Sequence, residues 1–306
     1  MAIQADFPAS LPAVPVAAVK LRKPRGPLAM GFMRTAANPV GMFGLVILAA
    51  LVLTALFAPV LAPYDPLLQH PGLELTGPSR IFPLGTDELG RDILSRLIYG
   101  ARPSLLVAVM VVAMAGGLGI LSGLVAGFWG GWVDTVLMRL FDALLAFPAI
   151  LLGFAVVAVL GPGTLQVAYA IAFGTLPGLA RVTRSLVLRE RNRDYILAAR
   201  SMGASGRRVM FRHVLPNSLP PLFVNLALLM GFSILAEAAL AFLGLGTRPP
   251  LPSWGAMLNE SRTYLRVAPW IAISPGGALA LLLLGLNYLA DALRDAFDPR
   301  RINAGA

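Results

Sequence analysis

Long apolar runs separated by polar segments dominate the pattern of this chain of 306 residues. A helix needs about 20 consecutive apolar residues to cross the hydrocarbon core of a bilayer. Runs near that length lie at 41–62, 105–128, 133–160, 165–180, 218–245 and 270–290. The pattern predicts an all-α polytopic membrane protein with six transmembrane helices. We expect the short fourth run to continue as a helix to Leu188, beyond the membrane.

The segment 63–102 is too polar to span a membrane and too long for a tight turn. Apolar residues recur at helical spacing in its second half, at Leu89, Ile93, Leu94, Leu97 and Ile98. Thr86 precedes them as a candidate N-cap, and two acidic residues follow it in what would be the first turn. These features predict an external segment with an amphipathic helix that begins after Thr86 and lies on the membrane surface.

Composition agrees with a membrane location. Hydrophobic residues make up 57% of the chain and charged residues 13%, with a mean hydropathy of +0.76; ordinary globular domains have roughly 45–50% and 25%. The chain contains no cysteine, which excludes disulfides, thiol catalysis and cysteine metal sites. His70 and His213 are its two histidines. We therefore predict no cofactor and no metal site.

The distribution of basic residues predicts the orientation, because loops rich in Lys and Arg remain in the cytoplasm. With the N-terminus inside, seventeen basic residues fall on the cytoplasmic side and seven on the external side. Segments 1–40 and 291–306 are then cytoplasmic tails, and we expect residues 1–38 to be loosely ordered. The net charge of +10 follows from this topology and from contact with the lipid bilayer, so it requires no nucleic-acid partner.

Two features inside the spans concern helix packing. Gly119, Gly123 and Gly127 recur every four residues in the second span and clear one face for the close approach of another helix. The sequence leaves open whether that helix belongs to this chain. Pro148 removes a backbone hydrogen bond within the third span, which predicts a kink there.

Charged residues within a bilayer need a partner or access to water. Arg139 and Asp142 lie three residues apart in the third span, and we expect them to form a local ion pair. Glu237 has no such partner in the fifth span. Two interpretations remain for Glu237: it lines an aqueous pathway, or it packs against a polar group of a neighbouring helix. Pro148, as a kink site, is likewise a candidate for a role in a pathway or in packing.

An arginine-dense segment, 181–217, separates the fourth and fifth spans. Asp194 is a candidate N-cap of a short helix that ends at Gly203, and Ser205 is a candidate N-cap of a second helix that Pro216 terminates. The pattern predicts a cytoplasmic elbow of two helices. Small and basic side chains on it suit docking to an acidic partner surface. The candidate docking residues are Asp194, Ala198, Ala199, Gly203, Arg207 and Arg208.

This elbow resembles the cytoplasmic loop of the inner-membrane permeases of ATP-binding-cassette importers, with the pattern Glu-Ala-Ala, three residues, Gly, nine residues, Ile, one residue, Leu-Pro. The chain has Leu197-Ala198-Ala199, then Gly203, then His213-Val214-Leu215-Pro216. Leu197 stands in place of the family's Glu, and His213 in place of its Ile. Asp194 is near enough to replace that Glu. The resemblance implies that Ala198, Ala199 and Gly203 form a coupling helix that docks to an ATPase.

Further motifs narrow the resemblance to the C-type permease subunit of dipeptide, oligopeptide and nickel importers. They are Leu84-Gly85-Thr86-Asp87-Glu88-Leu89-Gly90-Arg91-Asp92, Tyr99-Gly100-Ala101-Arg102, Phe211-Arg212-His213-Val214-Leu215-Pro216-Asn217, Phe242-Leu243-Gly244-Leu245-Gly246, Pro252-Ser253-Trp254-Gly255 and Leu293-Arg294-Asp295-Ala296-Phe297-Asp298-Pro299-Arg300. The resemblance covers residues 41–300. It implies one N-terminal span, at 41–62, followed by a five-helix core of the type I importer class, at 103–290.

The resemblance also implies function and partners. The chain would form half of a translocation pathway for peptides across the bacterial inner membrane, with a second, B-type permease, two ATP-binding subunits and an external substrate-binding protein. Nickel and glutathione are alternative cargoes. The chain is not expected to be an enzyme, because a phosphate-binding loop needs Gly-Lys-Ser or Gly-Lys-Thr, and its two lysines, Lys20 and Lys23, do not follow glycine.

Two other classes of function receive less support. Gly203-Ala204-Ser205-Gly206 fits the short Gly-x-Ser-Gly pattern of an intramembrane serine protease, and His213 follows. Ser205 lies among arginines outside any apolar run, however, where a helix cap explains it better. A self-sufficient channel or secondary transporter would call for a ring of charged residues or an inverted repeat, and the sequence shows neither.

Overall fold

A computed structural model describes residues 27–297 of the chain, and this part is built from helices without a strand. Two π-helical turns, η1 Val112–Gly116 and η2 Met210–Val214, lie within longer helices. The α-helices are α1 Pro27–Ala37, α2 Pro39–Leu56, α3 Ala58–Leu61, α4 Ile93–Val111, α5 Gly117–Trp129, α6 Gly131–Leu145, α7 Ala149–Leu160, α8 Thr164–Glu190, α9 Asp194–Ser201, α10 Gly206–Val209, α11 Leu215–Phe242, α12 Trp254–Ser261 and α13 Trp270–Phe297.

Five continuous helical stretches are long and apolar enough to cross a membrane: Pro39–Leu56, Ile93–Trp129, Thr164–Glu190, Gly206–Phe242 and Trp270–Phe297. They correspond to the predicted first, second, fourth, fifth and sixth spans, and the fourth continues past Leu188 as predicted. The predicted all-α polytopic class is confirmed. The predicted third span is divided into α6 and α7.

That division lies at Pro148, where the sequence predicted a kink in a continuous helix. Pro148 is the N-cap of α7, with φ −56° and ψ 131°. An extended ψ angle interrupts the helix completely, and the missing N–H of proline removes the hydrogen bond that would have joined the two parts. The kink prediction is therefore corrected to a break between two helices.

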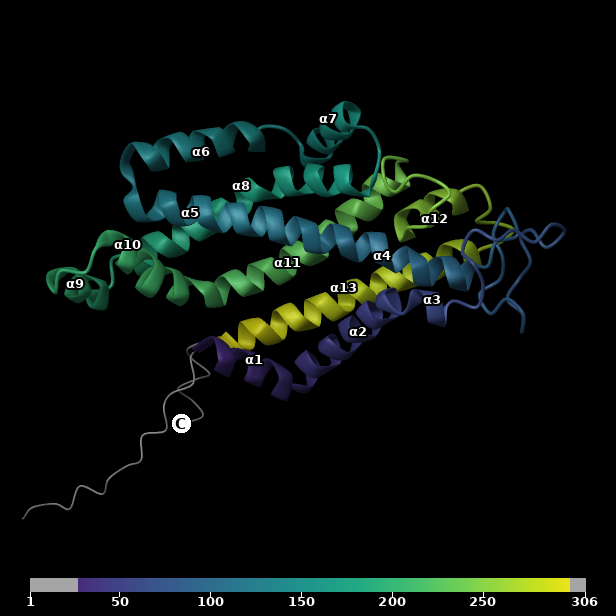
Figure 1. The fold of residues 1–306 in the computed structure, drawn as a ribbon, viewed down its shortest axis with the longest axis horizontal. Helices are drawn as coiled ribbons and strands as arrows, with labels where there is room; N and C mark the ends of the chain where they lie inside the picture. Colours follow the sequence, from purple (N-terminus) through teal and green to yellow (C-terminus); the bar gives the residue numbers. More distant parts are fainter. Residues whose placement is uncertain (1–26, 298–306) are drawn as a thin grey trace, which may run out of the picture.

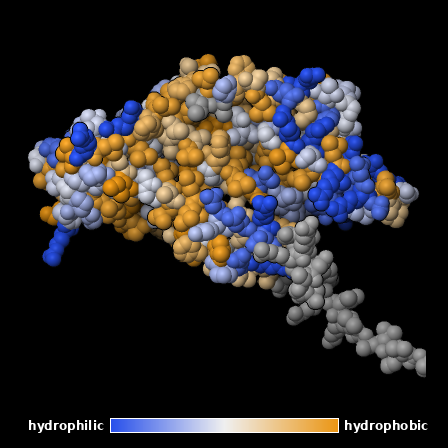
Figure 2. Space-filling model, turned by 180° about the vertical axis from the view of Figure 1, so that it is seen from behind, coloured by the Kyte–Doolittle hydropathy of each residue, from blue (hydrophilic) through white to orange (hydrophobic). Residues whose placement is uncertain are grey.

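The long helices run side by side along the length of the molecule (Figure 1). The short helices α9 and α10 lie at one end, and α1 and the end of α13 lie in the same half of the molecule, set back from that end. The segment between α3 and α4 lies at the opposite end with α12. Figure 2 shows an apolar middle section between two hydrophilic ends, as expected for a protein that spans a bilayer.

The glycine row packs α5 against α8 of the same chain. A Cβ atom at Gly119 would lie 3.2 Å from the carbonyl oxygen of Leu176, and one at Gly127 would lie 2.9 Å from that of Arg184. A Cβ atom at Gly123 would collide with the carbonyl oxygen of Ala180. The predicted packing face is confirmed, and the open question of its partner is settled in favour of this chain.

Helix boundaries differ from prediction at three places. Residues 27–37 of the expected loose tail form α1, where the buried Thr35 hydroxyl donates to the carbonyl of Gly31. Residues 291–297 of the predicted C-terminal tail belong to α13, which continues to Phe297. Residues 1–26 and 298–306 of the tails lie outside the described residues. Pro216 does not end the second elbow helix, because α10, η2 and α11 are continuous. The π-helical turn η2 changes the backbone hydrogen-bond pattern just before Pro216, so the helix continues beyond the proline.

The amphipathic helix predicted after Thr86 is also incorrect. Thr86 and Asp92 form an antiparallel bridge, and Gly90 between them has a φ angle of +71°. Asp92 is the actual cap, since its carboxylate accepts hydrogen bonds from the backbone N–H of Ser95 at 2.8 Å and from its hydroxyl at 2.6 Å. The helix that starts at Ile93 then continues into the second span as α4.

Candidate functional site

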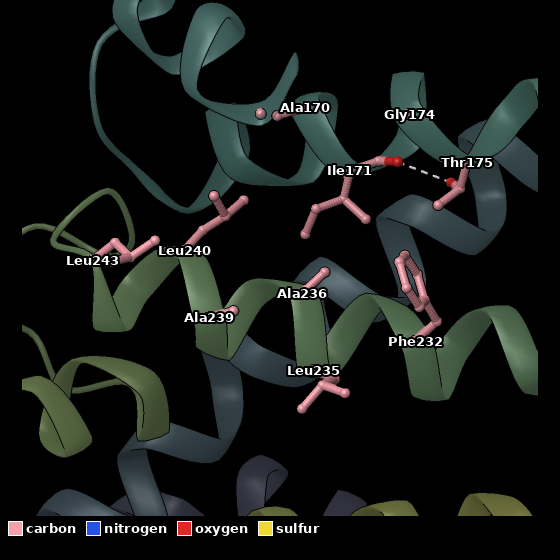
Figure 3. A pocket seen from close by; sticks show the side chains of 11 residues that line it. Ala170, Ile171, Gly174, Thr175, Phe232, Leu235, Ala236, Ala239, Leu240 and Leu243 are labelled. Atoms are coloured by element: carbon pink, nitrogen blue, oxygen red, sulfur yellow. Dashed lines mark hydrogen bonds between the residues drawn. The ribbon is translucent and has the colours of Figure 1, made fainter. Parts of the chain in front are cut away.

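A groove runs between α8 and α11 on the side covered by α7. Its first part is a cavity of about 250 Å³. Small residues, Gly174 on α8 with Ala236 and Ala239 on α11, leave this space, while Ile171 and Phe232 extend between the two helices (Figure 3). The lining is almost entirely apolar. The one hydroxyl group among its described lining residues, that of Thr175, already donates to the carbonyl of Ile171 at 2.8 Å.

Two further cavities extend the groove along the same helices. The second, of about 350 Å³, shares Gly174, Thr175 and Phe232 with the first. The third, of about 570 Å³, shares Asn225 and Leu228 with the second. The lining becomes polar in the third cavity, where the charged and amide side chains are Arg189, Glu190, Arg193, Asn217, Asn225 and Arg294. The groove thus changes from apolar to polar toward the end that carries α9.

The two residues with a candidate pathway role do not line these cavities. Glu237 is 1% exposed, and Ser104 of α4 donates its hydroxyl hydrogen bond to the Glu237 carboxylate at 3.0 Å. The other carboxylate oxygen has no hydrogen-bond partner among the described residues. This geometry fits the interpretation that Glu237 packs against a polar group of a neighbouring helix. Pro148 stands at the break between α6 and α7.

Helix α9 ends in a Schellman motif at Gly203. The backbone N–H of Gly203 donates to the carbonyl of Arg200 at 2.9 Å, and that of Ala204 donates to the carbonyl of Ala199 at 3.1 Å. Gly203 has a φ angle of +83°, which confirms the predicted left-handed conformation. This turn brings the chain from α9 directly into α10, so the elbow has a fixed shape.

The caps of the elbow differ from prediction. Arg193 is the N-cap of α9 and Asp194 is its first residue, so Asp194 contributes as an acidic group in the first turn. Ser205 is the N-cap of α10, as predicted, but its side chain makes no capping hydrogen bond. Arg207 and Arg208 follow it on α10 and are exposed.

One face of α9 is buried and the other is open. Ile196 is completely buried in a cluster with residues of α5, α8 and α10, and Ala199 is 6% exposed. Ala198 is exposed, beside Leu197 and Met202 at 53% and 82% exposure. The small side chain of Ala199 therefore serves packing within this chain, while Ala198 and its apolar neighbours form the outer surface of the elbow.

Several arginines of the segment hold the helices around the elbow together. Arg191 donates to the terminal carbonyls of α5, at 2.8 Å from Gly127 and 3.0 Å from Phe128. Arg184 of α8 makes a two-bond ion pair with Asp134 of α6. These contacts attach the elbow to the long helices. The sequence alone does not predict this structural role for the arginines.

The ion pair predicted between Arg139 and Asp142 is not formed. Arg181 of α8 reaches Asp142 instead, at 2.5 Å. Both side chains of this pair are 52% exposed, so it adds little to stability, but it connects α6 to α8.

A hydrogen-bonded latch connects α9 to both α8 and α11. The Tyr195 hydroxyl of α9 donates to the carboxylate of Glu190, the last residue of α8. Asn217 of α11 donates to the same hydroxyl at 3.0 Å, and Arg193 pairs with Glu190 at 3.1 Å. Partial burial, together with the Glu190 carboxylate, raises the pKa of Tyr195 to about 12. The hydroxyl therefore stays protonated and able to donate.

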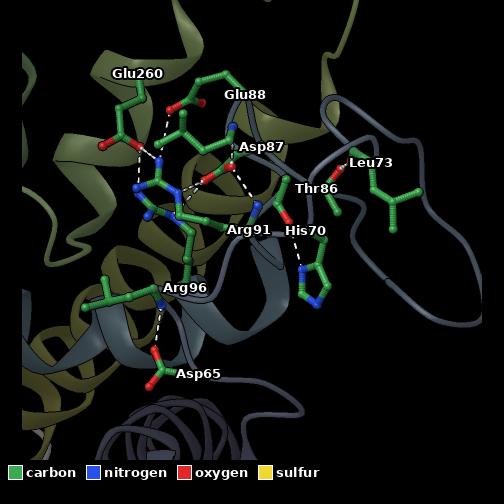
Figure 4. Close-up of polar contacts among 12 residues, drawn as sticks. Asp65, His70, Leu73, Thr86, Asp87, Glu88, Arg91, Arg96 and Glu260 are labelled. Atoms are coloured by element: carbon green, nitrogen blue, oxygen red, sulfur yellow. Dashed lines mark hydrogen bonds and ion pairs between the residues drawn. The ribbon is translucent and has the colours of Figure 1, made fainter.

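The opposite end of the molecule carries an ionic cluster in which Asp87, Arg91 and Arg96 are buried (Figure 4). Arg91 binds Asp87 at 2.6 Å and Glu88 at 2.9 Å, and Arg96 binds Glu260 of α12 at 2.6 Å. Burial, and next the Asp87 charge, raises the pKa of Glu88. The three carboxylates lie within 4.8 Å of one another. Guanidinium groups already bind each of them, so the cluster joins the segment before α4 to α12.

The chain matches the family model described as the inner membrane component of binding-protein-dependent transport systems over residues 119–303. Residues 26–78 match the N-terminal transmembrane domain of oligopeptide transport permease C. The di/tripeptide transport system permease protein DppC of Pseudomonas aeruginosa is 46% identical over 284 residues, covering 91% of this chain and 94% of that protein.

Two other comparisons add to this. The glutathione transport system permease protein GsiD of Pectobacterium atrosepticum is 44% identical over 261 residues, covering 85% of each chain. Among solved structures, an inward-facing conformation of the MetNI methionine ABC transporter aligns with a TM-score of 0.53 at 17% identity, covering 67% of this chain and 97% of that chain. This last likeness shows a shared fold.

Proposed function

The chain belongs to the family of binding-protein-dependent transport system inner membrane components, and we propose that it is the permease subunit of an ATP-binding-cassette importer for di- or oligopeptides. The 46% identity to a di/tripeptide permease over 91% of the chain carries the peptide assignment. The elbow at the end of α8 and α11 supports the importer mechanism, because it offers a rigid surface through which an ATPase can move two long helices.

Glutathione is the second candidate cargo. A glutathione permease at 44% identity is nearly as similar as the peptide permease. Both cargoes are small peptides with free carboxylates, so the same permease architecture suits either. Selection between them lies with the external binding protein that we propose as a partner.

In this proposal the exposed face of α9 docks into a cleft of an ATPase subunit. Ala198 and its apolar neighbours make the central contact, and Asp194, Arg207 and Arg208 make charged contacts around it. Gly203 fixes the angle between α9 and α10, while Ala199 fixes α9 to the rest of the chain. Movement of α9 is then transmitted through the latch at Tyr195 and through the continuous α10–η2–α11 helix.

The groove between α8 and α11 is our candidate for half of the translocation pathway, and a second, similar permease would complete it. The elbow end faces the cytoplasm in this arrangement, with both termini on the same side, and the end with the ionic cluster faces outward toward the binding protein. The protein would lie in the bacterial inner membrane. Pro148 contributes by separating α6 from α7, and Glu237 by packing behind the groove.

A reconstitution experiment tests the proposal. The chain is purified with the second permease and two ATPase subunits, inserted into proteoliposomes, and supplied with binding protein, ATP and labelled Ala-Ala or glutathione. We expect ATP-dependent uptake of one of them, and no ATP hydrolysis by the chain alone because it lacks a lysine-bearing phosphate loop. ATP hydrolysis by the isolated chain, or uptake that needs no ATPase subunit, would refute the proposal.

A further inference from the structure

Among the described residues, basic side chains outnumber acidic ones at the polar end of the groove. Its cavity of about 570 Å³ is lined by Arg189 of α8, Arg193 before α9 and Arg294 of α13, against a single acidic residue, Glu190. Arg193 already pairs with Glu190. Arg189 and Arg294 are exposed and take part in none of the ion pairs found within residues 27–297. Two guanidinium groups from separate helices thus line one cavity without an ion-pair partner among the described residues.

The remaining lining limits what this cavity accepts. Pro220, Pro221 and Leu228 form apolar parts of its α11 wall. The amide and hydroxyl donors of the same wall are already engaged. Asn217 donates to Tyr195 at 3.0 Å and to the carbonyl of His213 at 2.7 Å. Ser218 donates to the carbonyl of Val214 at 2.9 Å, and Asn225 to that of Pro221 at 2.8 Å. The free donors are therefore the two guanidinium groups, whose planar fork matches the two oxygens of a carboxylate. The chemistry selects a small molecule with an anionic end and a less polar remainder.

We infer that this cavity is an anion-binding subsite that receives the terminal carboxylate of a peptide as it leaves the groove, and this inference rests on the proposed function. The subsite adjoins the apolar groove through Asn225 and Leu228. A peptide moving along α8 and α11 therefore meets the two arginines before it leaves. The phosphate of an anionic lipid has the same charge chemistry, so the experiment below separates the two sources.

The test measures peptide binding to the permease–ATPase complex without nucleotide or binding protein, in phosphatidylcholine nanodiscs. The probes are labelled Ala-Ala and its C-terminal amide. We expect the wild-type complex to bind Ala-Ala about tenfold more tightly than the amide, as the loss of charge-assisted hydrogen bonds implies. The double variant Arg189→Gln/Arg294→Gln should bind both probes equally. Arg34→Gln is the control, because Arg34 is an exposed arginine of α1 outside the cavity lining.

Other outcomes would overturn the subsite. Equal binding of both probes by the wild type, or unchanged discrimination in the double variant, removes the carboxylate role. Nanodiscs that contain phosphatidylglycerol form the second arm: loss of bound phosphatidylglycerol in the double variant, with unchanged Ala-Ala binding, assigns the arginines to lipid and overturns the inference. If the wild-type complex still takes up peptide in the full ATP-driven assay, the proposed function stands while the subsite fails; absent uptake there contradicts the proposed function itself.

Discussion

Gly203 sets the angle between α9 and α10 through its backbone conformation alone. Its φ angle is +83°, and an added Cβ atom would meet no other atom within 4 Å. A β-branched residue at this position is strained by about 1–3 kcal/mol, which is too local to unfold the long helices. We expect Gly203→Val to assemble with its ATPases yet lose most uptake per ATP hydrolysed, measured in proteoliposomes.

Two variants control for this prediction. Gly203→Asn should retain most uptake, because Asn tolerates the left-handed conformation better than other non-glycine residues. Ser205→Ala should also retain it, since the Ser205 side chain makes no capping bond and its loss costs at most about 1 kcal/mol. A serine protease would lose all activity in Ser205→Ala. Wild-type uptake by Gly203→Val, with ATPases bound, would show that the elbow does not couple transport to hydrolysis.

The Tyr195 latch makes a prediction about alkaline pH. Because its pKa is raised to about 12 in the folded protein, the stabilisation from the protonated hydroxyl is complete below the ordinary tyrosine pKa of about 10 and is lost as the pH rises through about 12. Spectrophotometric titration of the wild type minus that of Tyr195→Phe should give a tyrosinate transition near pH 12. A difference transition near pH 10 would mean that the hydroxyl does not donate to Glu190.

At the scale of single elements, the α5–α8 contact depends on a backbone surface without side chains. A Cβ atom at Gly123 collides with the carbonyl of Ala180, whereas one at Gly117, on the same helix, meets nothing within 4 Å. Gly123→Ala should lower the melting temperature of the purified protein, since overpacking costs about 1–3 kcal/mol. Gly117→Ala should leave it equal or raise it, because Ala favours helix by about 1 kcal/mol. Equal melting temperatures for both variants would contradict this packing.

Hydrophobic runs and the glycine row predicted the long helices and one of their contacts, because both are properties of a single helix. The sequence does not predict the turn at Thr86–Asp92. The helical spacing of apolar residues belongs to a helix that begins after Asp92, and Thr86 is a second plausible cap before it. The sequence predicts that Pro216 ends the second elbow helix, because it gives no sign of the π-helical turn before the proline. At Pro148 the sequence predicts the position of the irregularity correctly, but it predicts a kink where the structure has a complete break between two helices.

The candidate site was predicted unevenly for a related reason. Gly203 and the elbow follow from local turn chemistry, so the sequence located them. The groove needs Gly174 and Phe232, which are far apart in the chain, to face each other across two packed helices. The partners of charged residues are equally non-local. The sequence predicts an ion pair between Asp142 and its neighbour Arg139, whereas Asp142 forms its ion pair with Arg181 of another helix. Ser104, which contacts Glu237, carried no signal in the sequence.

On the scale of the whole molecule, the two hydrophilic ends make the orientation testable. The elbow with Arg207 lies at one end, and Glu74 lies in the segment between α3 and α4 at the other. The excess of basic residues at the elbow end predicts that this end lies in the cytoplasm. The chain has no cysteine, so single-cysteine variants at these two exposed positions report sidedness without background.

We expect a membrane-impermeant maleimide to label Glu74→Cys in intact cells with the outer membrane permeabilised, and to label Arg207→Cys only after the inner membrane is opened. Both sites are exposed in the chain, so weak labelling at either one is not explained by burial within it. Docking of the elbow to an ATPase would also slow labelling of Arg207→Cys in opened membranes, and removing the ATPase subunits should restore it. Labelling of Arg207→Cys in cells with a closed inner membrane would invert the topology and exclude the elbow as the ATPase contact.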